Sequence, residues 1–253
     1  MAPVNEMAML THEYRTMFEI EEDYWWYRGV RIMLAGLLAR YLPGGRARLL
    51  DAGCGTGKNL ELLRDYGDAW GVDISAHALD FCLARGLARE RLVLASVVEL
   101  PFAENLFDLA ISFDVVCNIA DDVGAIMEIG RVLRPDGHAI LLLPAFEFLW
   151  SAHDVAVSHK YRYTAKSVAD KITRAGLTPE RVTYVNTLFF PLIALARFAR
   201  RPAIENGDDV RSDLVPLPRP LNALLTRLFQ AEMRAALSLN FPYGLSVLAI
   251  ARK

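Results

Sequence analysis

Cysteine is scarce in this chain, and its spacing excludes two common uses of the residue. Only three cysteines, Cys54, Cys82 and Cys117, occur among 253 residues. An odd number without C-x-x-C spacing argues against a disulfide framework and against a structural zinc site. We therefore expect no metal site and a reducing, cytoplasmic compartment.

An excess of charge of one sign is also lacking. The chain carries 28 lysines and arginines against 30 acidic residues, a formal net charge of −2, with no block of basic residues. Nucleic acids are bound by basic patches or stripes. The composition therefore argues against nucleic acid as a partner and leaves small molecules as the expected ligands.

Long apolar runs are missing as well. The longest apolar-rich stretch, residues 188–196, contains Pro191, whereas a membrane-spanning helix needs about 20 apolar residues. The first ten residues lack the basic segment and apolar stretch of a secretory signal. We expect no spanning segment, and no more than peripheral association with a membrane.

What the chain does have is an alternation of strand and helix signals. Its 53% of hydrophobic residues suffice for one large core, so we expect a single domain. The pattern predicts strands near 47–51, 69–73, 91–95, 107–113, 138–143, 181–185 and 245–250, and helices near 58–66, 76–86, 122–133 and 164–175. This alternation is typical of a parallel sheet covered on both faces.

A glycine-rich turn follows the first predicted strand. The segment 49–57, LLDAGCGTG, is an apolar strand that ends in an acid and continues as G-x-G-x-G. Glycines there allow positive φ and a close approach of the backbone to a ligand. A dinucleotide fingerprint would need glycine at Lys58, and a phosphate loop would need Ser or Thr at Asn59. Neither alternative fits this turn.

The second predicted strand also ends in an acid, Asp73, within the segment GVDIS. A carboxylate at this place can accept hydrogen bonds from both hydroxyls of a ribose. The two strand ends together predict a nucleoside-containing ligand. The alternative is that Asp73 is an exposed acid in a turn and binds no ribose.

Five ordered segments resemble the class I S-adenosylmethionine-dependent methyltransferases, in particular a broad bacterial group that acts on small molecules. They are DAGCGTG at 51–57, GVDIS at 71–75, LPF at 100–102, FD at 107–108 and RVLRPDG at 131–137. The resemblance implies a Rossmann-like doubly wound sheet with strand order 3-2-1-4-5-7-6 and an antiparallel last strand. It also implies S-adenosyl-L-methionine as cofactor and S-adenosyl-L-homocysteine as product.

The implied domain is a single unit over 1–253. It comprises an N-terminal helical and aromatic cap at 1–45, a cofactor-binding core at 46–187, inserted helices and a loop at 188–244, and the last strand at 245–253. Within the insertion, 201–220 reads as an exposed loop. The apolar residues of 221–233 form a helical stripe suited to packing on the domain itself, with a lid, a dimer face or a membrane contact as alternatives.

The resemblance assigns cofactor contacts residue by residue. Those expected are Asp51, Gly53, Cys54, Gly55, Gly57, Asp73, Ile74, Ser96, Val97, Phe113 and Asp114. Asp51 is expected to order the turn or to reach the ammonium group of the cofactor through water. Ser96 departs from the family, because an acid normally meets the adenine amino group there, and a turn-only role for Ser96 is the alternative.

A second departure follows the fourth predicted strand. Subgroup members often carry DVLEH, whereas residues 114–118 read DVVCN, so the acid–base pair of that motif is missing. Asn118 is retained as an expected acceptor contact. Cys117 is interpreted as an ordinary buried thiol, since a reactive cysteine needs a cationic neighbour.

The flanks supply the remaining candidates. The stretch that begins at His153 and Asp154 and continues through His159 resembles a subgroup segment and lies just beyond the fifth strand, where ligands bind in open α/β sheets. We expect these three residues to be catalytic, with His153 favoured as base and Asp154 as an orienter of the two histidines. A structural cluster of Asp154, His159, Arg162 and Tyr163 is the alternative.

Acceptor contacts are expected from Tyr24 and Trp26 in the aromatic segment YWWYR, and from Tyr163. These rings suit an aromatic lid, with helical core packing as the alternative. The expected function is methyl transfer to a small or medium-sized, largely apolar acceptor in a biosynthetic or secondary-metabolic reaction, by a monomer or homodimer. Alternatives are cyclisation or decarboxylation on the same cofactor, binding without turnover, and a lipid-linked acceptor.

Overall fold

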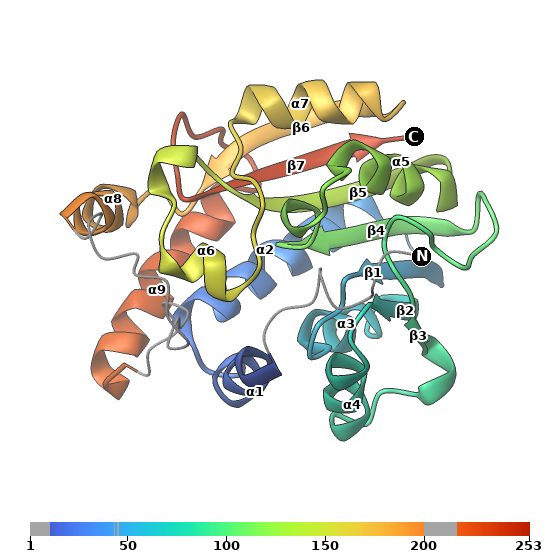
Figure 1. Ribbon diagram of the computed structural model, residues 1–253, viewed down its shortest axis with the longest axis horizontal. Coiled ribbons are helices and arrows are strands. Elements are labelled where there is room, and N and C mark those ends of the chain that lie inside the picture. Colours follow the sequence, from blue (N-terminus) through green and yellow to red (C-terminus); the bar gives the residue numbers. More distant parts are fainter. Residues whose placement is uncertain (1–10, 43, 45, 200–216) are drawn as a thin grey trace.

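The computed structural model describes residues 11–42, 44, 46–199 and 217–253 (Figure 1). Its seven-stranded sheet has the order β3-β2-β1-β4-β5-β7-β6. The strands β1 (Ala47–Ala52), β2 (Gly67–Asp73), β3 (Leu92–Leu94), β4 (Phe107–Phe113) and β5 (Leu133–Pro144) are parallel. β7 (Ser246–Arg252) runs antiparallel to β5 and to β6 (Thr178–Val185). The predicted fold class and strand order are confirmed.

The central strands are apolar on both faces, as expected for strands covered from two sides. Leu49 and Leu50 of β1 are fully buried. The largest difference from the predicted strand boundaries is at β5, which begins at Leu133 rather than near residue 138. Leu133 pairs with Phe107, and the register then shifts before Leu109, so an irregularity extends the pairing of β4 and β5.

The helices predicted between strands are present, and three of the four begin at side-chain caps. They are α3 (Lys58–Leu63), α4 (Ala76–Ala84), α5 (Asp122–Val132) and α7 (Ala165–Arg174). Ser75 accepts a hydrogen bond from the backbone of α4, Asp121 from that of α5 and Thr164 from that of α7. Such caps satisfy backbone N–H groups that have no partner inside the helix.

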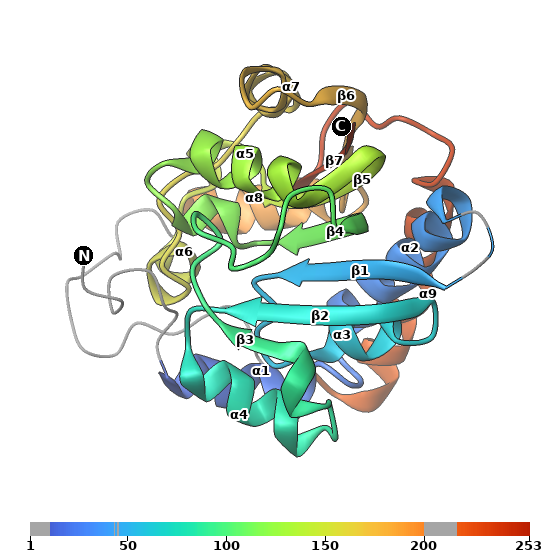
Figure 2. The same cartoon turned by 90° about the vertical axis from the view of Figure 1, so that its right-hand side faces the viewer.

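Two layers of helices enclose the sheet (Figure 2). One core cluster joins the sheet to α5 and α7, through residues such as Ile129 and Ile172. The other joins it to α2 (Trp25–Tyr41), α3, α4 and α9 (Arg219–Ala235), through residues such as Leu34 and Phe229. The inserted segment therefore contributes to the core.

The N-terminal cap and the insertion pack as one layer. The ring of Phe229 on α9 lies directly against Gly29 of α2, where a Cβ atom would come within 2.1 Å of it. Asn222 accepts a hydrogen bond from the backbone N–H of Trp25 at 3.0 Å and donates one to the carbonyl of Asp23 at 2.8 Å. The start of α2 is thus held by the insertion.

The predicted apolar stripe at 221–233 divides between two environments. Phe229 and Met233 are buried, whereas Leu221, Leu224 and Leu228 are exposed. Packing on the domain itself is therefore confirmed for part of the stripe only. Residues 201–216 of the predicted loop lie outside the described residues, and α9 already begins at Arg219.

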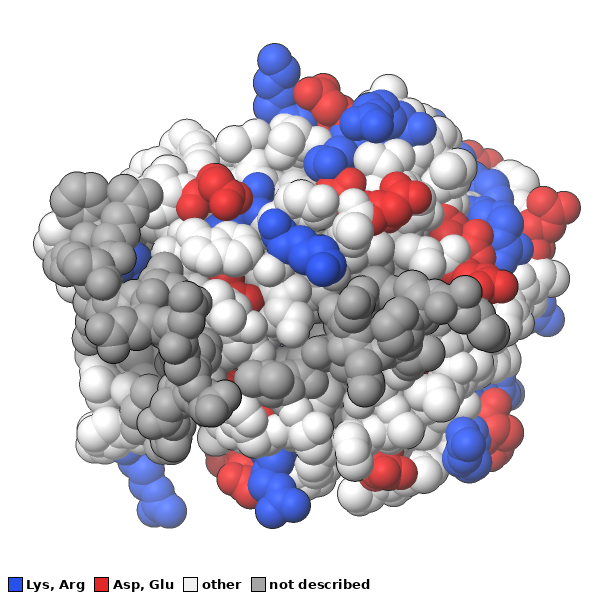
Figure 3. All heavy atoms as spheres, in the orientation of Figure 1, with Lys and Arg blue, Asp and Glu red and all other residues white. Residues whose placement is uncertain are grey.

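The remaining helices surround one end of the sheet. They are α1 (Thr11–Ile20), α6 (Ala152–Ala156) and α8 (Phe190–Ala199), with short 3-10 turns η3 (Val116–Asn118) and η4 (Glu147–Leu149). A further 3-10 turn, η2 (Arg89–Arg91), precedes β3. Within the described ranges, no helix combines the length and apolar character that crossing a bilayer requires. Basic and acidic side chains are interspersed on the face shown in Figure 3.

Candidate functional site

A cavity of about 770 Å³ opens at the carboxyl ends of the parallel strands. Most of the predicted site residues line it: Gly53, Cys54, Gly55, Asp73, Ile74, Ser96, Val97, Phe113, Asp114, Tyr24, Trp26, Asn118, His153 and His159. Asp51, Gly57, Asp154 and Tyr163 are absent from this lining. The topology therefore gathers segments from most of the chain around one space.

The glycine turn after β1 has the backbone that its composition predicts. Gly53, Gly55 and Gly57 have φ angles of 91°, 52° and 85°, in the left-handed region that favours glycine. A Cβ at Gly53 would come within 2.2 Å of Val115. The N–H groups of Gly53 and Cys54 both donate to the carbonyl of Val72 at 2.8 Å, which ties the turn to β2.

The two strand-end acids occupy different environments. Asp73 lines the cavity and accepts hydrogen bonds from the N–H groups of Gly55 at 2.8 Å and Ser75 at 2.9 Å. Burial raises the pKa of Asp73. Asp51 is buried, and its Oδ2 has no hydrogen-bond partner among the described residues. Burial, with the nearby charge of Asp73, raises the pKa of Asp51 to about 8.

The N-terminal cap is bonded to the glycine turn and to the helices beside it, and nothing in the sequence indicated these contacts. Buried Glu21 accepts hydrogen bonds from the hydroxyl of Thr56 and from the guanidinium of Arg85. Glu22 pairs with Lys58 at the start of α3. Burial raises the pKa of Glu21 despite these partners. No local pattern marks Glu21, because its partners are distant in the sequence.

Ser96 has the turn contact that its sequence context offered as the alternative, and it also lines the cavity. Its Oγ accepts a hydrogen bond from the N–H of Val98 at 3.3 Å. The hydroxyl therefore shapes the turn after β3. A hydroxyl retains a donor and a further acceptor site for a contact with a ligand.

The aromatic segment at the start of α2 faces the cavity and also packs against the insertion. Tyr24, Trp25, Trp26 and Tyr27 all line the cavity. The ring of Trp25 makes edge contacts with Phe189 and Phe229, at centroid separations of 5.0 and 5.1 Å. Cavity lining and core packing, which the sequence presented as alternatives, are combined in this segment.

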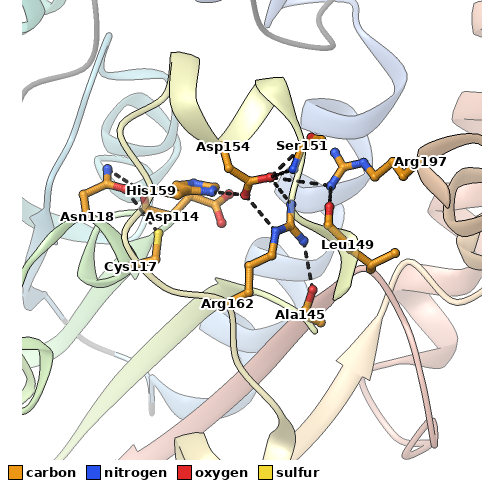
Figure 4. Close-up of polar contacts among 10 residues, drawn as sticks. All are labelled: Asp114, Cys117, Asn118, Ala145, Leu149, Ser151, Asp154, His159, Arg162 and Arg197. Atoms are coloured by element: carbon orange, nitrogen blue, oxygen red, sulfur yellow. Dashed lines mark hydrogen bonds and ion pairs between the residues drawn. The ribbon is translucent and has the colours of Figure 1, made fainter. Parts of the chain in front are cut away.

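Beyond β5, a buried carboxylate organises the opposite end of the cavity (Figure 4). Asp154 accepts hydrogen bonds from Nδ1 of His159 at 2.8 Å and from Arg162 Nε at 2.7 Å and Nη2 at 3.1 Å. Burial raises the pKa of Asp154, but His159 and Arg162 outweigh it and hold the pKa well below its usual range. Of the two histidines that Asp154 is expected to orient, His159 is bonded to it through Nδ1.

Tyr163 is not positioned to contact an acceptor. Its hydroxyl donates to Asp122 at 3.0 Å, and its side chain is buried between the sheet and the helices α5 and α7. Burial raises the pKa of Tyr163 well above its usual range. The predicted structural cluster is therefore confirmed for Asp154, His159 and Arg162, and Tyr163 belongs to a separate core contact.

Three residues at the end of β4, Asp114, Cys117 and Asn118, lie beside His159. The side-chain amide of Asn118 donates to the carbonyl of Asp114 at 3.3 Å, and Cys117 is fully buried. Burial raises the pKa of the Cys117 thiol well above its usual range, in keeping with the buried thiol that its sequence context predicts. The ring centroids of His153 and His159 are 6.0 Å apart.

Two further cavity residues carried no signal in the sequence. Asn186, at the end of β6, has a φ of 62° and is buried, and its Oδ1 has no hydrogen-bond partner among the described residues. Arg197 on α8 donates to the carbonyl of Leu149 at 2.8 Å and lies 3.9 Å from Asp154. Both come from segments after the region of the five ordered matches.

Comparison with known proteins agrees with this geometry. Residues 50–141 match the family described as a methyltransferase domain. The chain is 35% identical over 144 residues to malonyl-acyl-carrier-protein O-methyltransferase of Enterobacter lignolyticus, an alignment that covers 53% of this chain and 55% of that enzyme. It is 38% identical over 89 residues to a protein of Methanocaldococcus jannaschii, covering 35% of this chain and 34% of the relative. The chain thus spans about a third to a half of these relatives.

Solved structures extend the likeness of fold over most of the chain. A methyltransferase in complex with the Trm112 activator of Haloferax volcanii has a TM-score of 0.61 at 19% identity, over 96% of this chain and 93% of that one. The cyclase SpnF has a TM-score of 0.54 at 23% identity, over 88% and 80%. The sheet order, the glycine turn and the match of residues 50–141 to a methyltransferase domain together support a class I methyltransferase with S-adenosyl-L-methionine as cofactor.

Proposed function

We propose that the protein transfers a methyl group from S-adenosylmethionine to a small or medium-sized, largely apolar acceptor. The observation that carries this proposal is one continuous cavity, which runs from the glycine turn and Asp73 to the imidazoles of His153 and His159. Its volume of about 770 Å³ lies in the upper part of the range of about 300–1,000 Å³ that is common for small-molecule sites. Cofactor and acceptor would share this space.

The cofactor is proposed to lie along the ends of β1, β2 and β4. Gly53 and Gly55 would allow its methionine and ribose parts to approach the backbone, with Cys54 between them. Asp73 would accept the ribose hydroxyls, beside Ile74. Support comes from the positive φ angles of the turn and from the place of Asp73 in the lining.

The remaining contacts are proposed at the two ends of the cofactor, the adenine and the methionine. Ser96 and Val97 would meet the adenine, and Phe113 and Asp114 the methionine end. All four line the cavity. Asp51 would act indirectly, because it is buried behind the turn, and Gly57 would act by starting α3.

The acceptor is proposed to occupy the end bounded by the start of α2 and by α8. Tyr24 and Trp26 supply aromatic faces there, and Asn118 supplies an amide. Methyl transfer from a sulfonium needs alignment and exclusion of water, and a protonated acceptor also needs a base. We propose His153, which lines the cavity on α6, as the proton acceptor, and the Asp154–His159 pair as the group that positions the acceptor.

Cofactor binding is tested most directly by a matched pair of glycine variants. Gly55→Val adds a side chain in the turn, where φ is 52° and a Cβ would lie 3.1 Å from Met17. Gly176→Val adds the same side chain at a φ of 81°, with nothing within 4 Å of the new Cβ. Calorimetry should show lost S-adenosylmethionine binding for the first variant and wild-type affinity for the second. Equal affinity in both would show that the turn is not the cofactor site.

Turnover is tested by formation of S-adenosylhomocysteine with a panel of apolar alcohols, acids and thiols. A cofactor that binds but is never converted would instead favour the non-transfer chemistry of a cyclase, or binding alone.

A lipid-linked acceptor is a second candidate, favoured by the surface of α8. Ile193 and Arg197 of this helix line the cavity, while Leu192 and Leu195 are 70% and 67% exposed. An apolar face beside the cavity suits an acceptor with a lipid tail. Flotation with liposomes tests this candidate, since a protein that stays in the aqueous fraction argues for a free small molecule.

A further inference from the structure

Three side chains of different chemistry converge at the end of β4. A carboxylate oxygen of Asp114, the sulfur of Cys117 and a ring nitrogen of His159 all lie within 4.8 Å of one another. Asp114 and His159 line the cavity, whereas Cys117 lies behind them and is fully buried. The three residues come from two segments that the fold brings together (Figure 4).

The Asp114 carboxylate lacks the partners that usually accompany a buried charge. Charged neighbours influence it, but no residue in the described part of the chain donates a hydrogen bond to its oxygens. A half-buried carboxylate without such a donor is stabilised by a bound cation.

His159 is held in the manner of a metal ligand. Its Nδ1 is 2.8 Å from Asp154, which is itself fixed by Arg162 and by the backbone N–H of Ser151 at 2.8 Å. With Nδ1 directed at the Asp154 carboxylate, Nε2 is the ring nitrogen left for another partner. A carboxylate on the far nitrogen is the usual companion of a metal-bound histidine.

We propose that Asp114, Cys117 and Nε2 of His159 bind one divalent transition-metal ion, with Zn²⁺ as the best match. Oxygen, sulfur and nitrogen together suit Zn²⁺ rather than Mg²⁺ or Ca²⁺, which select oxygen ligands. Three protein ligands with one position left for water or substrate is the arrangement of catalytic zinc sites. On binding, the thiol of Cys117 and the carboxyl of Asp114 release any protons they hold to solvent.

The spacing is compatible with tetrahedral coordination after a small contraction. Zinc bonds of about 2.0–2.3 Å place ligand atoms roughly 3.3–3.8 Å apart. The three ligand atoms now lie within 4.8 Å of one another. They must therefore move closer together by about 1 Å, which side-chain rotation supplies. The spacing of cysteines in the sequence gave no sign of this site, because only one cysteine takes part.

A metal here would deepen the proposed function, and this part of the inference rests on that function. The open position would face the cavity and hold an oxygen, nitrogen or sulfur of the acceptor, lowering the pKa of that atom. His153 would then receive the proton. Metal binding itself does not depend on methyl transfer and is measured separately.

The experiment uses the full chain, stripped with a chelator and titrated with Co²⁺ and then with Zn²⁺. We expect one ion per chain and a near-ultraviolet charge-transfer band of a thiolate–Co²⁺ bond, which Zn²⁺ removes by displacement. Cys117→Ser should abolish the band, and Asp154→Asn should weaken Zn²⁺ binding about 10- to 100-fold. Cys82→Ser should keep the band, because Cys82 lies beside Cys54, with 3.9 Å between the sulfurs.

The outcomes distinguish this inference from the proposed function. A folded wild type that binds no Co²⁺ or Zn²⁺ overturns the metal site, as does a band that survives in Cys117→Ser. Where a variant fails to fold, the wild-type spectrum and stoichiometry still decide. Because Asp114 belongs to both proposed sites, calorimetry of S-adenosylmethionine is done on the stripped and on the metal-loaded protein. Failure to bind in both forms would concern the proposed function alone.

Discussion

The Asp154 cluster predicts a large loss of stability when its carboxylate is removed. Asp154 and Arg162 have side-chain exposures of 0% and 4%, and Asp154 accepts from Arg162, His159 and Ser151. Asp154→Ala leaves the Arg162 guanidinium buried, and among the described residues the Ala145 carbonyl at 2.8 Å is its remaining acceptor. Breaking a buried ion pair by removal of one partner costs about 3–5 kcal/mol.

Urea unfolding measures this loss. With a slope of roughly 3 kcal/mol per molar urea, the midpoint should fall by about 1–1.7 M. Asp154→Asn keeps the shape but loses the charge, so its loss should be smaller, about 1.5–3 kcal/mol. Asp136→Ala removes the exposed pair with Arg252 and should change the free energy of unfolding by less than about 1 kcal/mol. A shift for Asp154→Ala no larger than that of Asp136→Ala would refute the reasoning.

The same cluster predicts a dependence on pH with a definite sign. The folded pKa of Asp154 is lower than its unfolded value of about 3.9, so its contribution to stability is fully present above that value. The contribution is lost as the pH falls toward the folded pKa. The stability difference between wild type and Asp154→Ala should therefore shrink on acidification from pH 6 to pH 2, and a difference that stays constant would contradict it.

Three further predictions concern the cofactor, the acceptor and the packing of the insertion. Asp73→Ala should weaken S-adenosylmethionine binding by about 1.5–3 kcal/mol in calorimetry, and an unchanged dissociation constant would rule out the ribose contact. His153→Ala should lower kcat by about 10²–10⁴ with little change in cofactor affinity, and wild-type turnover would remove His153 as base. Phe229→Ala should destabilise the fold by about 3–5 kcal/mol, because its ring fills the space against Gly29, and a loss under 1 kcal/mol in urea unfolding would show that α9 does not hold α2.

The sequence by itself determined the sheet and the glycine turn after β1. Strand signals such as Leu49 and Leu50 are local, and the left-handed φ of Gly53 and Gly55 is a property of glycine itself. The strand order followed from the resemblance carried by those segments. These features were predictable because each is specified by residues that are neighbours in the chain.

Only the tertiary structure decided which side chains meet. The sequence placed Asp154 next to His153, but the chain turns so that Asp154 bonds His159, and Tyr163 points instead to Asp122. The contacts of Glu21 with Thr56, and of α9 with α2, likewise join residues far apart in the sequence. Direction and distance of side chains depend on how elements pack, and periodicity along the chain does not carry that information.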